Sequence, residues 1–221
     1  MQTLVRNPLA DPYLLGVSAG ASVGATAVIA LGMFASWGPH RLTLGALVGA
    51  LGAAGLVYLI SMAQGGMTPL RLVLSGVVLS AAFSALASFL VFRSSDPRAA
   101  QSVLYWMLGS VAGATWDSLW VAAIVTALSA GLMIAFSGWL DALAAGTDVA
   151  RSLGIPDTRV RKALFVGNSV LVGVLVAVSG GIGFVGLVIP HMSRLLVGAS
   201  HRSMVPVAAA IGSLFLLWVD V

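Results

Sequence analysis

The chain has 221 residues, of which 59% are apolar and only 8% are charged. An ordinary soluble domain carries about a quarter charged residues, so this composition excludes a soluble globular protein. The absence of cysteine from the sequence excludes a disulfide framework and a thiolate metal site. The net charge of +4 comes from basic residues scattered between apolar runs. We interpret them as topology signals and expect no nucleic-acid partner.

Seven apolar runs are long enough, or nearly long enough, to cross a membrane, which takes about 20 residues in a helix. They predict an all-α fold, a polytopic membrane helix bundle surrounded by lipid. The fifth and sixth runs are short, and Gly180 and Gly181 between them predict a tight turn near one membrane face. The runs cover residues 14–34, 42–63, 70–92, 118–138, 163–179, 182–197 and 204–221.

The basic residues predict the orientation of the bundle. If all seven runs cross, eight of the eleven Arg and Lys residues lie on one side and three on the other. The richer side is expected to face the cytoplasm. The eight are Arg6, Arg71, Arg151, Arg159, Arg161, Lys162, Arg194 and Arg202, and the three are Arg41, Arg93 and Arg98.

Two connections are longer than turns. The outer one is predicted to hold a short helix within 97–109, because its apolar residues form one stripe. The loop 139–162 is the longest on the cytoplasmic side. We expect residues 141–145 to extend the fourth span, and Thr147 or Asp148 to cap a short helix that runs to Leu153. Gly154 then ends that helix, and another begins after Pro156.

Small residues recur along the first two runs. Gly16, Gly20 and Gly24 repeat every four residues, and Gly45 and Gly49 do the same in the second run. Such spacing allows helix backbones to approach closely in lipid, where dispersion rather than the hydrophobic effect holds helices together. The pattern leaves two roles open for the first three glycines, which are helix packing and lining of a transport pathway.

The sequence offers no enzymatic constellation. It contains no Glu, no paired carboxylates and no phosphate-binding loop, so we expect neither catalysis nor a cofactor. His191 follows Pro190 and invites a metal interpretation, but no partner stands at ligand spacing. We therefore expect no metal site and place His191 at the membrane interface.

Four stretches, in this order along the chain, carry a resemblance to a known family. They are 7–22 (NPLADPYLLGVSAGAS), 71–77 (RLVLSGV), 105–110 (YWMLGS) and 180–191 (GGIGFVGLVIPH). Together they resemble the FecCD-type permeases of binding-protein-dependent ABC importers for ferric siderophores, haem and cobalamin. The resemblance covers nearly the whole chain and implies one permease domain over 1–221. It implies that this domain is partial, a fragment that lacks both ends and holds about seven of roughly ten spans; a true seven-span variant is the alternative.

The resemblance also implies functional residues. The loop matches the family's coupling loop, in which Leu153 and Ile155 are expected to insert into the ATPase while Asp148 and Arg151 hold the rim. Two turns beside span starts are expected to act as a cytoplasmic gate. The coupling residues are Gly146, Asp148, Ala150, Arg151, Leu153, Gly154, Ile155 and Pro156, and the gate residues are Asn7, Leu9, Met67, Thr68 and Pro69.

The function that the resemblance implies is import across the bacterial inner membrane. The chain is expected to act as a permease subunit in a homodimer with a second permease copy, an ATP-binding cassette ATPase and an extracytoplasmic substrate-binding protein. Ferric siderophores are the expected substrate, with haem and cobalamin as alternatives within the family. A secondary transporter driven by an ion gradient is the alternative from another class, and it predicts interrupted helices with ionisable residues at mid-membrane.

Overall fold

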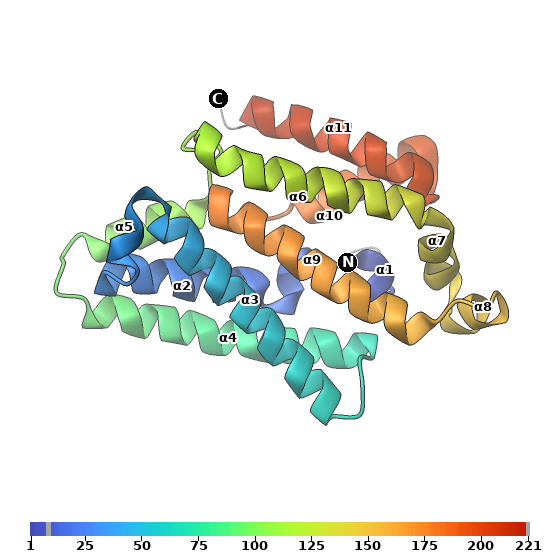
Figure 1. Cartoon of the computed structure of the whole chain (residues 1–221), viewed down its shortest axis with the longest axis horizontal. Coiled ribbons are helices and arrows are strands. Elements are labelled where there is room, and N and C mark those ends of the chain that lie inside the picture. The colour runs from blue at the N-terminus through green and yellow to red at the C-terminus, as the bar shows by residue number, and fades with distance from the viewer. Residues whose placement is uncertain (8–9, 220–221) are drawn as a thin grey trace.

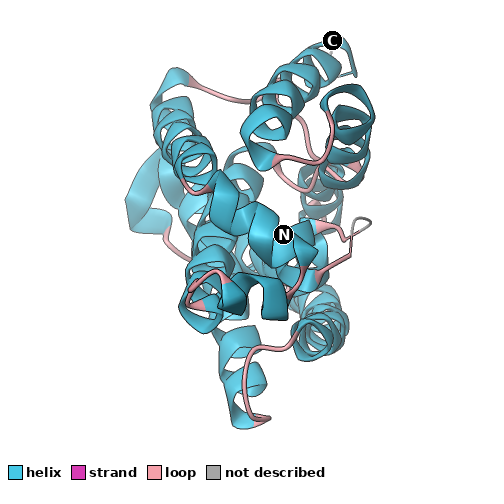
Figure 2. Ribbon diagram, turned by 90° about the vertical axis from the view of Figure 1, so that its right-hand side faces the viewer, coloured by secondary structure: helices cyan, strands magenta, loops and turns pink. Residues whose placement is uncertain are grey.

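The computed structural model describes residues 1–7 and 10–219, so Leu9 of the predicted gate lies outside the described residues. This described part of the chain consists of helices and connecting loops, without strands (Figure 2). The elements are α1 (Gln2–Val5), η1 (Pro12–Leu15), α2 (Val17–Leu31), η2 (Ala35–His40), α3 (Arg41–Ala63), α4 (Pro69–Arg93), α5 (Ala99–Leu108), α6 (Trp116–Ala135), α7 (Ser137–Ala145), α8 (Thr147–Ser152), α9 (Asp157–Ser179), α10 (Val185–Val197) and α11 (His201–Val219).

The long helices lie roughly along one axis of the molecule, with α5 near one end and α7 and α8 at the other (Figure 1). We call these the α5 end and the α8 end. Each of the seven apolar runs contains one long or apolar helix, and the predicted outer helix is α5. Helices α3, α4, α6, α9 and α11 are long and apolar enough to cross a membrane. The predicted all-helical membrane bundle is therefore confirmed.

Helices α2 and α10 are shorter than the other apolar helices. They contain 15 and 13 residues. At 1.5 Å per residue they are about 22 Å and 20 Å long, whereas the hydrocarbon core of a bilayer is about 30 Å thick. Neither helix crosses the membrane by itself. A crossing by either run would therefore include chain that is not α-helical, which is tolerated at membrane depth only where protein covers it.

The segments that lead into these two short helices pack against each other. The Tyr13 hydroxyl, in η1 just before α2, donates a hydrogen bond of 2.8 Å to the Ile182 carbonyl. A Cβ atom on Gly186, in the first turn of α10, would lie 2.7 Å from the ring of Pro12. The two entry segments therefore cover one another inside the bundle, and one side-chain donor satisfies a carbonyl there.

Gly180 and Gly181 form more than a simple turn. Gly180 ends α9 with a φ of 70°, which favours glycine. A Cβ atom on it would lie 2.3 Å from the Trp106 carbonyl oxygen in α5. The backbone N–H of Ser110 donates to the Ser179 carbonyl at 2.8 Å. The glycine pair thus lets the backbone at the end of α9 contact the backbone at the end of α5.

A backbone-to-backbone contact joins α2 to α3. A Cβ atom on Gly24 would lie 1.9 Å from the Gly45 carbonyl oxygen, and one on Gly20 would lie 2.4 Å from that of Gly49. The two backbones touch, as the small-residue spacing allows. Gly16 faces α4 instead, where its Cβ atom would lie 3.3 Å from the Gly76 carbonyl oxygen.

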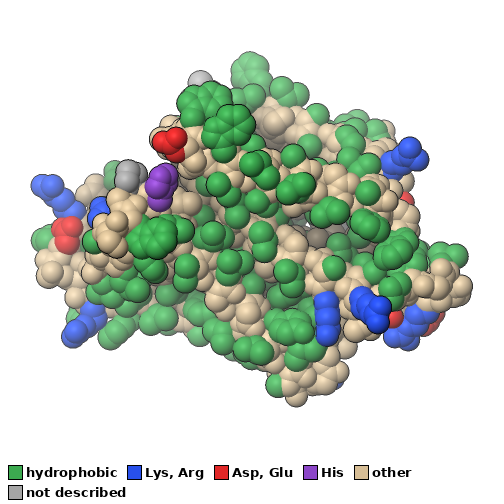
Figure 3. Space-filling model, viewed as in Figure 1, with side chains coloured by type: hydrophobic (Ala, Val, Ile, Leu, Met, Phe, Trp, Pro, Cys, Tyr) green, Lys and Arg blue, Asp and Glu red, His purple; other side chains and the backbone are tan. Residues whose placement is uncertain are grey.

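The outer surface of the bundle is apolar along its length. Large apolar side chains are widely exposed on α4, α6 and α11, including Phe92 at 85%, Trp120 at 65% and Trp218 at 84%. Basic side chains gather toward the two ends of the long axis, with an apolar band between them (Figure 3). This distribution matches a multi-pass membrane protein whose apolar band faces lipid.

The glycine contact leads to a first prediction. Replacing Gly24 with alanine forces α2 away from α3, because the new methyl group meets backbone atoms that cannot move aside. We expect the G24A variant to lose about 1–3 kcal/mol of stability, as overpacked sites do. The measurement is the midpoint of thermal unfolding in detergent.

The matched control is Gly52→Ala in α3, because nothing lies within 4 Å of a Cβ atom at Gly52. That variant is expected to keep or slightly raise the midpoint, since alanine favours helix over glycine. Equal midpoints for the two variants would contradict the assigned contact.

Candidate functional site

Helices α7 and α8 form a small unit that projects from the bundle at the α8 end (Figure 1). Helix α6 ends at Ala135, and the ring of the next residue, Phe136, packs on Trp139 with 5.3 Å between the ring centroids. Residues 137–145 form the separate helix α7, so the prediction that 141–145 extends the fourth span is wrong. Helices α7 and α8 meet at Gly146, whose φ of 146° favours glycine. The predicted cap at Thr147 or Asp148 is wrong, because Gly146 occupies the N-cap position without a side-chain hydrogen bond.

The unit has its own small core, formed by Ala142, Leu143, Ala150 and Ile155. The prediction that Ile155 is exposed for insertion is therefore wrong, since its exposed fraction is 8%. Gly154 adopts a φ of 73°, and the chain turns back so that the Ile155 N–H donates to the Ala150 carbonyl at 2.9 Å. This turn buries Ile155 against α8.

The outward face of α8 is partly apolar. Leu153 is 66% exposed and Val149 is 43% exposed, and Asp148 lies beside them on the surface. Arg151 pairs with Asp157 at 3.2 Å within the same chain, and hydrogen bonding to this carboxylate raises the pKa of Arg151. Because the Arg151 side chain is largely exposed, this ion pair adds little stability. It connects α8 to the start of α9.

Two polar contacts attach this unit to the bundle, and the coupling-loop residues predicted from the sequence include neither of them. Asp141 in α7 contacts His201 at the start of α11, and Arg161 in α9 contacts Thr147 in α8. The sequence could have pointed to Asp141, His201 and Arg161 only because they are ionisable residues next to membrane spans, and such residues are candidates for function. Their partners are 60 and 14 residues away along the chain, so spacing alone does not reveal these contacts.

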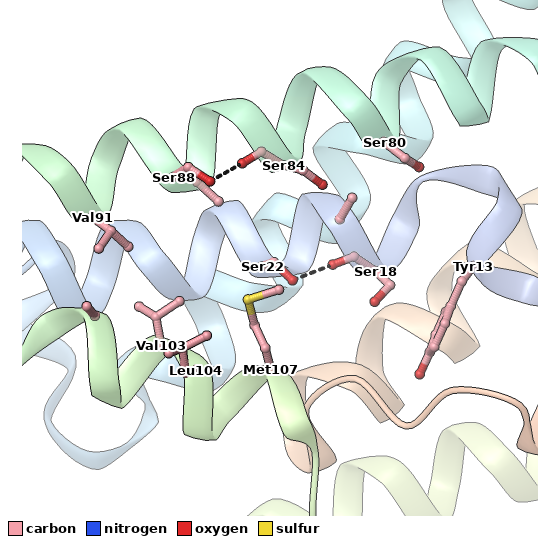
Figure 4. Close-up of a pocket in the computed structure, with 13 residues that line it drawn as sticks. Tyr13, Ser18, Ser22, Ser80, Ser84, Ser88, Val91, Val103, Leu104 and Met107 are labelled. Atoms are coloured by element: carbon pink, nitrogen blue, oxygen red, sulfur yellow. Dashed lines mark hydrogen bonds between the residues drawn. The ribbon is translucent and has the colours of Figure 1, made fainter.

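A second candidate site is a cavity of about 600 Å³ between α2, α4 and α5 (Figure 4). Five serines from α2 and α4 line it, spaced four residues apart on each helix, while α5 contributes mainly apolar side chains. None of the described residues that line the cavity is charged. The serines are Ser18, Ser22, Ser80, Ser84 and Ser88.

Three of these hydroxyls donate to the carbonyl four residues earlier in their own helix. The donors are Ser22, Ser80 and Ser88, at distances of 3.1, 2.7 and 3.0 Å. Their protons are thereby used, and each oxygen presents lone pairs to the cavity. The wall is weakly polar and offers acceptors without charge, which suits a ligand that must pass without being held tightly.

The glycines Gly16, Gly20 and Gly24 are not among the residues that line this cavity. They face the neighbouring helices α3 and α4. Ser18 and Ser22 stand two positions away from these glycines along the chain, which places them on the opposite side of α2. Of the two roles that the sequence left open, these contacts favour helix packing.

The described gate residues lie at helix ends near the α8 end. Thr68 accepts a hydrogen bond from the Arg71 N–H at 3.4 Å and caps α4, in which Pro69 is the first residue. Met67 packs against the main hydrophobic core. The backbone N–H of Asn7 donates to the Gln2 carbonyl at 3.1 Å, just after α1. Helix α1, which precedes Asn7, contacts α4.

Metal binding receives no support from the geometry. Within residues 1–7 and 10–219, no group of three or more His, Cys, Asp or Glu side chains is arranged to hold a metal ion. His191 is exposed on α10, where the helix continues beyond Pro190 to Val197.

The sequence matches the FecCD transport family over residues 1–221, and the chain belongs to that family. It is 37% identical to the cobalamin import system permease protein BtuC of Halobacterium salinarum, covering all of this chain and 58% of that protein. It is 36% identical to the molybdate import system permease protein MolB of Haemophilus influenzae, and 35% identical to the Fe(3+)-citrate import system permease protein YfmD of Bacillus subtilis. The alignments cover all of this chain and 64% of each of these two proteins.

A solved structure gives the same picture of the fold. It is described as an inward-facing conformation of a metal-chelate type ABC transporter, and it matches with a TM-score of 0.89 at 34% identity. The match covers 99% of this chain and 68% of the other. The chain thus spans 58–64% of the length of the three curated relatives named above.

The buried position of Ile155 leads to a second prediction. Ile155→Ala opens the small core of α7 and α8, and we expect a loss of about 2–5 kcal/mol in the stability of this unit. Leu153→Ala is the matched control, because the exposed Leu153 side chain leaves no cavity. Limited proteolysis between residues 137 and 156 is the measurement. Cleavage that is equally fast in both variants would contradict the assigned burial.

Proposed function

We propose that this chain forms the core of a permease subunit in an ATP-driven importer, with the α8 end in the cytoplasm. The carrying observation is the projecting α7–α8 unit, a compact body with its own core and an exposed apolar face. Exposed apolar patches at a polar end of a protein typically mark interaction sites. Membership of the FecCD family supports an ATPase as the partner.

The distribution of basic residues supports the proposed orientation. Arg6, Arg71 and Lys162, like the other residues of the eight-member set, belong to helix ends or loops at the α8 end, whereas Arg41, Arg93 and Arg98 belong to the α5 end. The excess of positive charge on one side is typical of the cytoplasmic face. The α5 end would then meet the extracytoplasmic substrate-binding protein.

We further propose that the serine-lined cavity belongs to the transport pathway, which a second permease copy would complete. Helix α4 exposes several of its residues beyond the cavity, including Val78, Phe89 and Phe92. An uncharged, weakly polar wall suits a bulky complex that carries its own hydrogen-bonding groups. We propose ferric siderophores as that substrate. The relative named for Fe(3+)-citrate import supports an iron complex, while the other two relatives are named for cobalamin and molybdate import.

The docking role leads to a third prediction. Leu153→Ser removes the most exposed apolar side chain of the proposed contact, and we expect the ATPase to bind about 30-fold more weakly, or about 2 kcal/mol, as for a typical hot spot. Binding of purified ATPase to the detergent-solubilised permease is the measurement. Leu153→Met is the control and retains affinity. Unchanged affinity in Leu153→Ser would remove α8 from the ATPase interface.

The pathway role leads to a fourth prediction. Ser84→Leu places a branched apolar side chain in the wall of the cavity. We expect uptake to fall about tenfold while ATPase binding is unchanged, since narrowing a pore raises the barrier to passage. Ser213→Leu, on the exposed face of α11, makes the same chemical change far from the cavity and serves as the control. Equal uptake by both variants would place the pathway elsewhere.

A further inference from the structure

The N-terminus of α11 is held by a carboxylate from another helix. Asp141 in α7 accepts hydrogen bonds from the His201 backbone N–H at 2.9 Å and from the Ser200 hydroxyl at 3.1 Å. It also pairs with Nδ1 of the His201 ring. Burial opposes ionisation of Asp141, but these hydrogen bonds outweigh it and hold the pKa of the carboxyl below its usual value. Asp141 therefore caps α11 from outside that helix.

The other side of the His201 ring faces α1. Its Nε2 atom lies 2.9 Å from the hydroxyl oxygen of Thr3, and the residue as a whole is 9% exposed. Both ring nitrogens are thus engaged, and the ring has one orientation. A side chain held at both ends transmits position between the elements it joins. The His201 side chain is 11% exposed and that of Asp141 is 36% exposed, so the ring itself is the buried part of this link.

A second buried side chain, from α9, joins α1 to α8. Arg161, which is 7% exposed, donates from Nη1 to the Leu4 carbonyl of α1 at 3.1 Å. Its Nη2 donates to the Thr147 hydroxyl, the first residue of α8, also at 3.1 Å. The planar guanidinium fixes the direction of both hydrogen bonds at once. Loss of either acceptor would leave part of a buried charge unpaired.

The two contacts converge on adjacent residues of α1. Thr3 receives the link from α7 through His201, and Leu4 receives the link from α8 through Arg161. Helix α1 also packs against α7 and α9. Along the chain α1 is followed by η1 and α2, and α2 carries Ser18 and Ser22 of the cavity. The unit that projects toward the proposed ATPase is thereby connected to a wall of the proposed pathway.

We infer that Asp141, Arg161 and His201 are positioning residues that carry a displacement of α8 to α1 and α11, and through α1 to the pathway. This inference rests on the proposed importer function. It names the residues by which ATP-driven movement reaches the membrane helices. Such coupling requires a part of the protein with two arrangements, whose balance both the ATPase site and the pathway shift. The appropriate test therefore measures the coupling of ATP hydrolysis to transport directly.

The test uses the complete permease in proteoliposomes with its ATPase and binding protein, and a radiolabelled ferric siderophore as the probe. Thr147→Val keeps side-chain shape and removes the hydroxyl that accepts from Arg161. Asp141→Asn keeps side-chain shape and removes the negative charge that pairs with His201, which weakens the second link. We expect both to assemble normally and to transport about tenfold less substrate per ATP hydrolysed, within the range of typical coupling factors. Arg159→Gln, two residues from Arg161 and exposed, is the control and retains the wild-type ratio.

Transport per ATP that is unchanged in assembled Thr147→Val and Asp141→Asn would overturn the inference. A merely structural role lowers the unfolding midpoint and leaves that ratio unchanged, so a lower midpoint with a normal ratio would overturn the inference as well. If Asp141→Asn does not assemble, Thr3→Val probes the same link from α1. A double variant of Thr147→Val with Arg161→Lys provides a further check, because residues on one route are expected to be non-additive.

The failure of this inference and the failure of the proposed function are distinguishable. Suppose that Leu153→Ser binds the ATPase weakly while Thr147→Val transports the normal amount of substrate per ATP. That result would agree with the proposed importer function and overturn only the role of Asp141, Arg161 and His201. Transport by the wild type without an active ATPase would overturn both.

Discussion

The contact between the backbones of α2 and α3 is the constraint on which the arrangement depends. In lipid, burial of apolar surface does not distinguish one helix pairing from another, so close approach decides which helices pack. Gly20 and Gly24 allow this approach on one side of α2, and Gly16 and Gly76 allow a similar one toward α4. The side of α2 that carries Ser18 and Ser22 then faces the cavity, which α5 and α4 also line.

The short length of α2 follows from the same arrangement. A helix that starts within the bundle requires that the chain before it be covered by protein. The entry to α10 supplies that cover, since Ile182 accepts a hydrogen bond from Tyr13 and Gly186 lies against the ring of Pro12. Interrupted helices also occur in secondary transporters. Here the nearby ionisable side chain, Asp11, caps η1 by accepting the Tyr13 N–H at 2.8 Å, which is a local structural role. The family assignment likewise favours the ATP-driven importer.

Hydropathy predicted the seven apolar helices because the bilayer demands long apolar runs whatever their tertiary contacts. An apolar stripe in the outer connection predicted α5. The ends of α2 and α10 were not predictable, since the entry segments are as apolar as the helices. Ile155 and Leu153 have similar side chains two residues apart, and only the turn at Gly154 decides which is buried. Arg161 reaches Leu4 across 157 residues, a contact that no local pattern contains. The role of the coupling and gate residues stays a prediction.

The most direct measurement is uptake by cells that carry this permease gene with the genes for its partner subunits. The panel contains radiolabelled ferric siderophores, haem and cobalamin, each tested with an intact and with an inactive ATPase. The account predicts uptake of a ferric siderophore that requires the intact ATPase. Uptake that ignores the ATPase and collapses with the ion gradient would contradict it and favour a secondary transporter.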